Sequence, residues 1–248
     1  MTLHLLVGIV TPMKPQQTDG QKLRRLYVFI AVGCIIFVIF TLVAMLTYAG
    51  GWVEKPTARG YSFTQNFLSN LGTLTALSGK PNWISAALFF IALAGAGACL
   101  VIFFTIFRRF FRHSLMQNVL SLLGSIVGVL AGINFMGIAF APADVAKAAH
   151  IQFVMWAFRL FPLAVLCYLP VMFADRQYPK FFAWVFTVFC LLLIGYFLLL
   201  TNGPSLSSPQ GLVVQVVGQK VIAYASIVSI FIQSVGAYSF ISRKDNTS

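Results

Sequence analysis

Long apolar runs alternate with short polar segments along this 248-residue chain. Six of the runs have roughly 20 residues each, the length a helix needs to cross the hydrocarbon core of a bilayer. None shows the two-residue alternation of a barrel strand, and only helices and closed barrels satisfy all their backbone hydrogen bonds in lipid. The pattern therefore predicts six transmembrane helices, over residues 26–49, 84–107, 119–140, 148–173, 181–200 and 217–240.

The predicted fold is an all-α, six-transmembrane-helix bundle with a polar segment at each end. Residues 1–25 precede the first apolar run, residues 26–240 form the membrane domain, and residues 241–248 form a tail. The first helix is expected to be retained, because residues 5–10 lack the preceding basic region of a cleaved signal peptide. The longest predicted connection, residues 50–83, joins the first two helices.

The segment 62–79 within this connection is rich in Asn, Ser and Gly. Its apolar residues recur at three- and four-residue intervals, which would place them on one face of a helix and the polar residues on the other. The pattern predicts an amphipathic outer-loop helix at the membrane surface, capped by Ser62. Such a helix would either close the bundle or face a ligand. Its apolar face comprises Phe63, Phe67, Leu71 and Leu74, and its polar face comprises Asn66, Ser69, Asn70 and Thr73.

Composition agrees with a membrane protein, and the charges orient it. The chain is 59% hydrophobic and 9% charged, whereas soluble domains contain about 25% charged residues. Most of the 17 Lys and Arg residues flank predicted helices on the side that both termini share, which predicts that both termini are cytoplasmic. The net charge of +12 is attributed to this bias and to attraction by anionic lipid. Nucleic-acid binding is not expected, because the basic residues do not interleave with aromatic residues on a soluble face.

No metal, cofactor or disulfide is expected from the reactive residues. The four cysteines lie in different predicted spans and lack metal-ligand spacing, so they are expected to serve as small packing residues. No nucleophile motif, intramembrane carboxylate pair or glycine-rich phosphate loop can be assembled from the sequence. The cysteines are Cys34, Cys99, Cys167 and Cys190.

Arg159 lies deep in the fourth predicted span, about 16 Å from its start at about 1.5 Å per residue. A charge at this depth needs a partner, water or the bundle interior, yet none of the five acidic residues lies within a span. A guanidinium without an acid suits the phosphate or carboxylate of a ligand. The alternative is internal bracing by Asn134 and by the Phe158 carbonyl, which Pro162 frees from the helix.

His150 is the second candidate for chemistry. Asp144, which follows Pro142, is predicted to cap the fourth helix, so His150 would lie in its outer part, where an imidazole can exchange a proton. A lone histidine in such a place is more often a hydrogen-bonded packing residue, and Arg159 would point to the opposite face. His150 and Ser69 share one predicted side of the membrane and are weak catalytic candidates.

Small residues on one face of the third helix predict close packing. Gly124, Gly128 and Gly132 recur every four residues, a spacing that lets a neighbouring helix approach closely. The neighbour would belong to the same chain or to a second copy. A faint repeat, in which residues 65–73 recur as residues 117–125, would suit an inverted-repeat transporter, although chance in a biased composition explains it better.

One short motif resembles a known group of membrane proteins. The stretch FLSNLGT, residues 67–73, resembles the hydrophobic-Ile-Ser-Asp/Glu-x-Gly-Thr signature of a broad six-helix group whose bacterial branch is the domain of unknown function 998. Ala148-Ala149-His150, after Asn134 in the third helix, is similar to the pattern of its DRAM-type relatives, a group that includes Sfk-type proteins and GPI-lipid-remodelling factors. The resemblance implies six helices, a lipid-related role and a bacterial inner-membrane location.

The chain departs from this pattern at two places. Asn70 stands at the acidic position of the signature, and Gln215, Gln219 and Lys220 stand where DRAM-like proteins carry a His and an acid near the last helix. Acid-dependent chemistry of the group is therefore not expected here.

The combined expectation is a membrane protein that binds a lipid or other anionic amphiphile and has a lipid-regulatory role. Its pocket would face outward, between segment 62–79, the outer end of the fourth helix and the start of the sixth. A small transporter and a lipid-modifying enzyme are the alternatives, and the glycines of the third helix offer an interface for an oligomer. The expected ligand contacts are Arg159, Asn134, Lys220, Asn66, Ser69, Asn70, Asp144 and His150.

Overall fold

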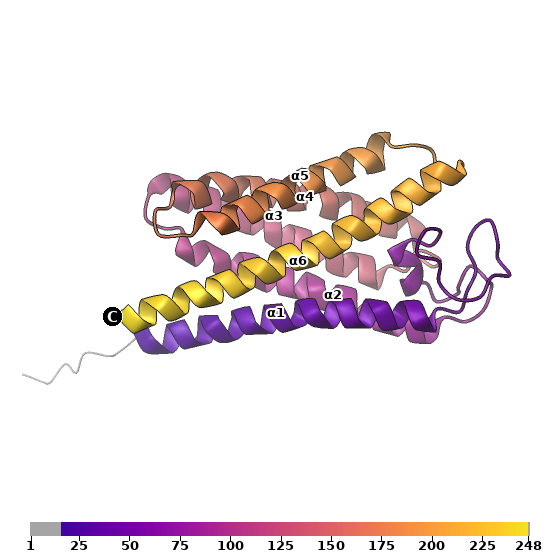
Figure 1. Cartoon of the computed structure of the whole chain (residues 1–248), viewed down its shortest axis with the longest axis horizontal. Helices are drawn as coiled ribbons and strands as arrows, with labels where there is room; N and C mark the ends of the chain where they lie inside the picture. Colours follow the sequence, from indigo (N-terminus) through magenta and orange to yellow (C-terminus); the bar gives the residue numbers. More distant parts are fainter. Residues whose placement is uncertain (1–15, 248) are drawn as a thin grey trace, which may run out of the picture.

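All six predicted spans fold as α-helices (Figure 1), within residues 16–247, the part of the chain that the computed structural model describes. Each helix is long and apolar enough to cross a membrane, which confirms the six-helix membrane bundle. Residues 1–15 of the predicted N-terminal segment and Ser248 of the predicted tail lie outside the described part. The elements are α1 (Gln16–Thr47), the 3-10 helix η1 (Leu68–Gly72), α2 (Trp83–Phe107), the 3-10 helix η2 (Arg108–Phe110), α3 (Leu115–Phe140), α4 (Lys147–Ala174), α5 (Lys180–Asn202) and α6 (Pro209–Thr247).

Two helices extend well beyond their apolar runs. α1 begins at Gln16 and α6 runs from Pro209 to Thr247, so polar residues next to the membrane continue both helices. Local chemistry explains the early start of α6. The Ser208 hydroxyl accepts a hydrogen bond from the Gly211 amide at 3.1 Å, which satisfies a free N–H of the first turn. A proline suits the first helical position, because its missing N–H would have no partner within the helix.

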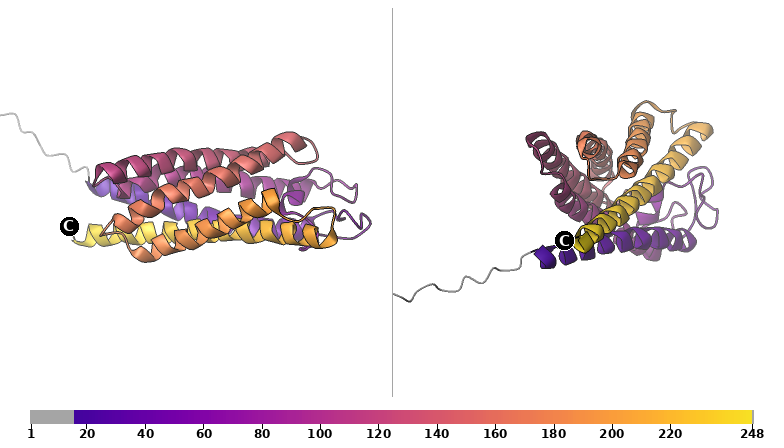
Figure 2. Two further views of the ribbon diagram at one scale, coloured as in Figure 1. Left: turned by 90° about the horizontal axis from the view of Figure 1, so that it is seen from above. Right: turned by 60° about the vertical axis from the view of Figure 1, so that its left-hand side comes forward.

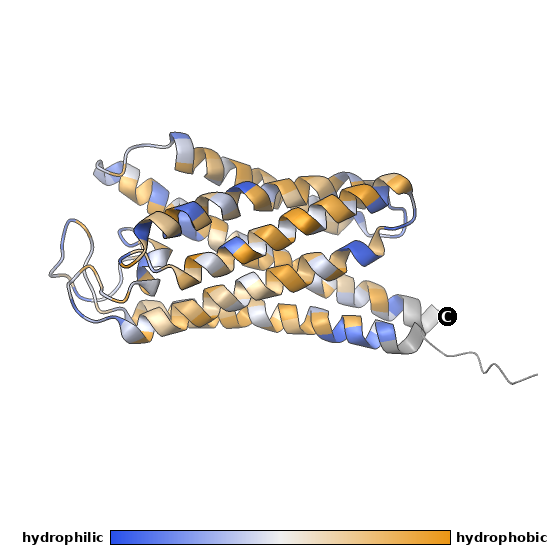
Figure 3. Cartoon of the chain, turned by 180° about the vertical axis from the view of Figure 1, so that it is seen from behind, coloured by the Kyte–Doolittle hydropathy of each residue, from blue (hydrophilic) through white to orange (hydrophobic). Residues whose placement is uncertain are grey.

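The helices pack in chain order around a closed ring. Each helix contacts the next one, and α6 returns to contact α1. The described ends of the chain lie together at one end of the bundle, the terminal end, and the loop of residues 48–82 lies at the other, the long-loop end (Figures 1 and 2). Most residues along the helices are apolar and polar residues gather at both ends (Figure 3), and many large apolar side chains of the helices are exposed, as expected of a bundle that has lipid as its solvent.

Aromatic side chains fill the ring towards the terminal end. Phe107 is fully buried, and its ring centroid lies 4.7 Å from that of Phe103 and 5.0 Å from that of Tyr168. The Ser125 hydroxyl donates a hydrogen bond to the Phe104 carbonyl at 2.6 Å and is bonded to the Tyr168 hydroxyl at 2.7 Å. This half of the bundle interior is therefore filled by aromatic side chains at favourable stacked and edge-to-face distances.

The glycine ladder of α3 gives the close approach that the sequence predicts, but within a single chain. A Cβ added at Gly124 would lie 2.8 Å from the ring of Tyr168 on α4, and one at Gly128 would overlap the ring of Phe104 on α2. A Cβ at Gly132 would lie 2.9 Å from the backbone of α2. All three glycines are buried, so this face of α3 is occupied inside the ring and is not a free face for a second copy.

The faint sequence repeat does not correspond to a repeated structure. Residues 65–73 belong to the long loop and its 3-10 helix, whereas residues 117–125 lie wholly within α3. The two segments have different backbone conformations, so chance similarity is the better interpretation of the repeat.

The helix in the long loop is shorter than its sequence pattern predicts. Segment 62–79 contains only the five-residue η1. The fully buried Asn66 side chain accepts a hydrogen bond from the Ser62 amide at 2.8 Å and donates one to the Gly51 carbonyl at 2.9 Å. These bonds take the place of helix backbone bonds, so Ser62 caps no helix, Asn66 points inward and Phe63 remains 52% exposed. The structure thus corrects both the extent and the faces of the predicted helix.

Asp144 does not cap α4. The residue at the N-cap is Ala146, which makes no side-chain capping bond. The Asp144 carboxylate instead accepts a hydrogen bond from the Thr75 amide at 2.9 Å. The capping prediction is wrong because the helix begins only at Lys147, three residues after Asp144, whose carboxylate is bonded to the long loop.

Gly128→Ala is expected to lower the unfolding temperature of the purified protein, because the new Cβ would overlap the buried Phe104 ring. Overpacking of this kind costs about 1–3 kcal/mol. Gly195→Ala on α5 is the matched control, since a Cβ there meets no atom within 4 Å and alanine favours a helix by about 1 kcal/mol over glycine. Thermal unfolding in detergent measures both, and equal unfolding temperatures for the two variants would contradict the packing of α2 against α3.

Candidate functional site

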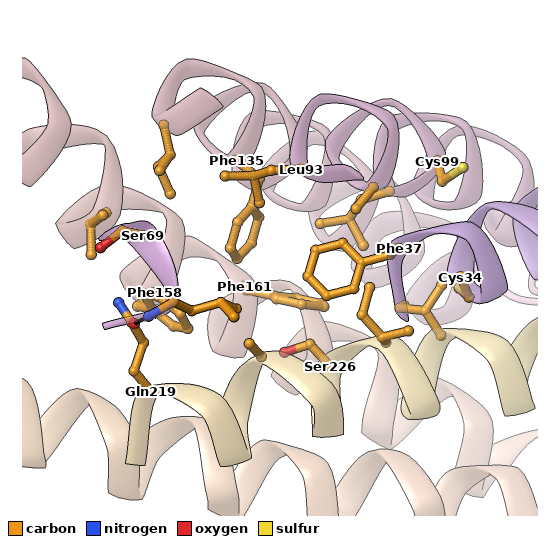
Figure 4. A pocket seen from close by; sticks show the side chains of 18 of the residues that line it. Cys34, Phe37, Ser69, Leu93, Cys99, Phe135, Phe158, Phe161, Gln219 and Ser226 are labelled. Carbon is orange, nitrogen blue, oxygen red and sulfur yellow. Dashed lines mark hydrogen bonds between the residues drawn. The ribbon is translucent and has the colours of Figure 1, made fainter. Parts of the chain in front are cut away.

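The ring encloses an apolar cavity in its long-loop half (Figure 4). Helices α1, α2, α3, α4 and α6 line it, and residues of η1 lie at one end. The volume of the cavity is about 100 Å³. It is therefore a narrow slot rather than a round chamber. Its wall includes Phe37, Phe89, Leu93, Phe135, Phe158 and Phe161.

Polar groups gather at the end of the cavity beneath η1. Figure 4 shows Ser69 and Gln219 at this end, and Cys34 and Cys99 towards the other. The Gln219 carbonyl oxygen accepts a hydrogen bond from the Leu68 amide at 2.7 Å. This bond fixes the side chain of Gln219 and leaves its Nε2 without a hydrogen-bond partner among residues 16–247. The cavity therefore has an apolar body and a polar end.

A groove adjoins the cavity between α2, α3, η1 and the start of α4. Its volume is about 500 Å³. Ser69, Phe89 and Ile138 line both hollows, so the cavity and the groove share a boundary at these three residues. Gly72 lets Phe89 pack closely at this boundary, since a Cβ added there would lie 2.5 Å from the Phe89 ring. Trp83, which is 73% exposed, stands at the start of α2 on the groove's rim.

His150 lines the groove and is only 8% exposed. Its Nδ1 is 2.8 Å from the Ala141 carbonyl oxygen, and because a carbonyl only accepts, Nδ1 carries the hydrogen. The Nε2 of the neutral ring is then an acceptor, and it has no hydrogen-bond partner in the described part of the chain. Nor do the described residues include any group of three His, Cys, Asp or Glu that could hold a metal ion.

Lys220 and Asn66 clamp the long loop to α6. The buried Lys220 ammonium donates to the Asn66 carbonyl at 2.5 Å and to the Val216 carbonyl at 3.4 Å, and it lies over the rings of Tyr61 and Phe63 at 5.3 and 5.0 Å. Carbonyls and aromatic faces thus satisfy the charge without an acid. Burial raises the pKa of the Tyr61 phenol above its usual range, so the phenol stays neutral and donates to the same Asn66 carbonyl at 2.9 Å.

Arg159 lies on the exposed face of α4, outside the ring. Its guanidinium is 5.4 Å from the centroid of the Trp156 ring and 5.8 Å from that of the Phe197 ring of α5. Arg159 does not line the cavity or the groove. Neither the Phe158 carbonyl nor Asn134 accepts a hydrogen bond from it in the described part of the chain. The Asn134 amide donates back to the Leu130 carbonyl at 2.8 Å.

The structure brings the predicted ligand contacts together only in pairs, Ser69 with His150 and Lys220 with Asn66. Ser69 and His150 line one groove. No contact joins Arg159, Asn134 and Lys220 within residues 16–247. The remaining predicted contacts have structural bonds in the loops. Asn66 belongs to the clamp, Asp144 holds the Thr75 amide, and the Asn70 carbonyl accepts the Thr73 hydroxyl at 2.8 Å.

The sequence reasoning missed the face of α6 that lines the cavity. Gln219, Ala223, Ser226 and Ile230 all lie on this face. Their spacing of four, three and four residues is typical of one helix face. A stripe of small and polar residues within an otherwise apolar helix was the available signal, and only Gln219 was singled out, as a departure from the family pattern.

Comparison of the chain with protein-family models, with curated proteins and with solved structures finds no match. The resemblance to the six-helix lipid-related group therefore stays a prediction. What the site does has to be inferred from its geometry.

Lys220→Met is expected to loosen the loop that covers the polar end of the cavity. The variant keeps the apolar stem but loses a charged hydrogen bond to the Asn66 carbonyl, a bond that contributes about 1.5–3 kcal/mol. Amide hydrogen exchange of residues 61–73 should then accelerate by about tenfold or more. Lys80→Met, which changes an exposed lysine of the same loop, is the control and should leave exchange unchanged. Unaltered exchange in both variants would show that the clamp does not hold the loop.

Proposed function

We propose that this integral membrane protein binds a lipid or similar amphiphile, with the apolar chain in the central cavity and the polar head at the long-loop end. The observation that supports this most directly is the cavity itself, an apolar slot whose polar groups lie at one end. Ligand sites are typically concave and mostly apolar, with a few polar groups that orient the ligand.

The surroundings of the cavity favour a hydrocarbon ligand. Its wall is formed by Phe, Leu, Ile, Val, Ala and Cys side chains, with Ser69, Gln219 and Ser226 as the polar exceptions. An apolar cavity of this kind excludes water and takes up apolar molecules. In a bilayer the most abundant apolar molecules are lipid chains, and a narrow slot suits an unbranched chain.

The cations of the chain do not support the anionic head that the sequence suggests. Lys220 is bonded to carbonyls of the loop and of α6, and Arg159 lies on the outer face of the ring. Neither lines the cavity or the groove. The proposal therefore keeps the amphiphile and assigns its recognition to uncharged groups.

The orientation of the protein follows from its basic residues. Polar residues collect at both ends of the bundle (Figure 3), and the terminal end carries Arg108, Arg109, Arg112, Arg176 and Lys180. The positive-inside rule then supports cytoplasmic termini, with the polar end of the cavity at the outer membrane surface. We propose a bacterial inner membrane as the location, on the basis of the motif at residues 67–73.

Ala223→Phe is expected to expel the bound amphiphile, because a phenyl group at this position on α6 would fill the slot. Native mass spectrometry of the gently purified protein measures the co-purifying lipid, which should fall by about tenfold or more, a change worth about 1.4 kcal/mol. Val228→Phe is the control, since Val228 is 53% exposed on the same helix, and it should leave bound lipid unchanged. Retention of the lipid by a folded Ala223→Phe protein would contradict the proposal.

Arg159→Leu is expected to leave the cavity-bound amphiphile unchanged, because the guanidinium lies on the outside of the ring against Trp156 and Phe197. The same mass spectra test this, with Ala223→Phe as the positive control. Selective loss of an anionic lipid from Arg159→Leu would instead place the headgroup at the outer surface of α4.

A further inference from the structure

We infer that the amphiphile carries an uncharged hydroxyl head, which seats in the groove between α2, α3 and η1 and donates a hydrogen bond to Nε2 of His150 while pairing with the hydroxyl of Ser69. This inference rests on the proposed function and specifies the chemical class of its ligand. It concerns the groove, which adjoins the cavity that holds the chain.

The two hollows are placed to receive two parts of one molecule. Ser69, Phe89 and Ile138 line both of them, so a ligand that lies across their shared boundary has its chain in the cavity and its head in the groove. Ser69 is the polar residue at this boundary. Its hydroxyl makes no hydrogen bond within residues 16–247, and a hydroxyl can both donate and accept.

His150 presents a fixed acceptor to the groove. The bond from Nδ1 to the Ala141 carbonyl, 2.8 Å long, holds the ring and assigns its hydrogen. Nε2 is left as an acceptor on a side chain that is only 8% exposed. A polar atom in an apolar setting is unfavourable without a hydrogen-bond partner, and a ligand that supplies a donor removes this cost.

The rest of the groove lining excludes a charged head. Apart from Ser69, His150 and the exposed indole of Trp83 on the rim, the lining consists of glycine, proline and apolar side chains. Asp144, the nearest acid in sequence, is bonded to the Thr75 amide, and Lys147 is exposed; neither lines the groove. A carboxylate or phosphate would bring no donor for Nε2 and find no cation, and an ammonium would find no anion. Burying such a charge unpaired is far more costly than burying a hydroxyl.

The depth of the groove matches the depth of a lipid hydroxyl. The groove begins at Trp83, the first residue of α2, and runs down to Ile91, a rise of about 12 Å at about 1.5 Å per residue. Exposed tryptophans are typical of the membrane–water interface, and Trp83 is 73% exposed. His150 lies one turn into α4. The two polar groups thus lie just below the interface, where long-chain alcohols and acylglycerols carry their hydroxyls.

Three probes with one oleyl chain test the inference. Oleyl alcohol has a donor, oleyl methyl ether lacks it, and oleate carries a charge. We expect the delipidated protein in detergent to bind oleyl alcohol at least tenfold more tightly than either of the others. The His150→Asn variant, whose amide can replace Nδ1 as donor to Ala141 but lacks Nε2, should bind the alcohol and the ether equally.

Two further variants keep the outcomes distinct. Ser69→Ala, a smaller change with little risk to the fold, should reduce the preference for the alcohol several-fold, and Ala223→Phe should abolish binding of all three probes. Equal binding of the three probes to the wild-type protein, or tightest binding of oleate, would overturn the hydroxyl inference while leaving the proposed function intact. Failure of the wild-type protein to bind any probe would refute both. A preference for the alcohol that survives both His150→Asn and Ser69→Ala would place the head elsewhere.

Discussion

Closure of the helix ring is the constraint on which the rest of this structure depends. Because the six helices pack in chain order and α6 returns to α1, side chains alone must fill the interior. Towards the terminal end, Phe104 and Phe107 do so, and Gly128 makes room for the Phe104 ring. Towards the long-loop end, α6 presents Ala223 and Ser226, which are too small to fill the interior. The cavity thus results from the difference in side-chain size between the two halves of the bundle interior. It needs no distortion of the helices.

The polar groups at the long-loop end divide into those that the fold satisfies and those that it leaves open. Asn66 and Lys220 find partners in the backbone of the loop and of α6, as buried polar groups generally must. The Ser69 hydroxyl, Gln219 Nε2 and His150 Nε2 have no such partner among residues 16–247. All three belong to side chains that line the cavity or the groove. A loop fixed by hydrogen bonds, next to polar groups without partners, is the arrangement expected of a preorganised ligand site.

The sequence predicts the helices far better than it predicts the site, for a physical reason. Apolar length alone identifies a membrane helix, so all six spans were found, and the glycines of α3 indicated close packing. The direction in which a side chain points around its helix depends on neighbours that one sequence does not reveal. Arg159 was therefore expected to meet Asn134 and Lys220, yet it faces outward. The loop helix was overextended because nothing local shows that Asn66 bonds to Gly51, fifteen residues away.

A protein with a net charge of +12 is an unexpected setting for an uncharged ligand, but the positions of the charges remove the difficulty. The attraction between two charges weakens with the distance between them. Most of these cations flank the helices at the ends of the bundle, where basic residues favour one orientation in the membrane. Lys220, the cation nearest to the polar end in sequence, already has its acceptors. In the proposed site, recognition of the ligand is therefore left to hydrogen bonds with fixed direction. A site built around hydrogen bonds discriminates strongly against a ligand that lacks the required donor. Each additional methylene in the apolar chain of the ligand adds only a modest preference in affinity.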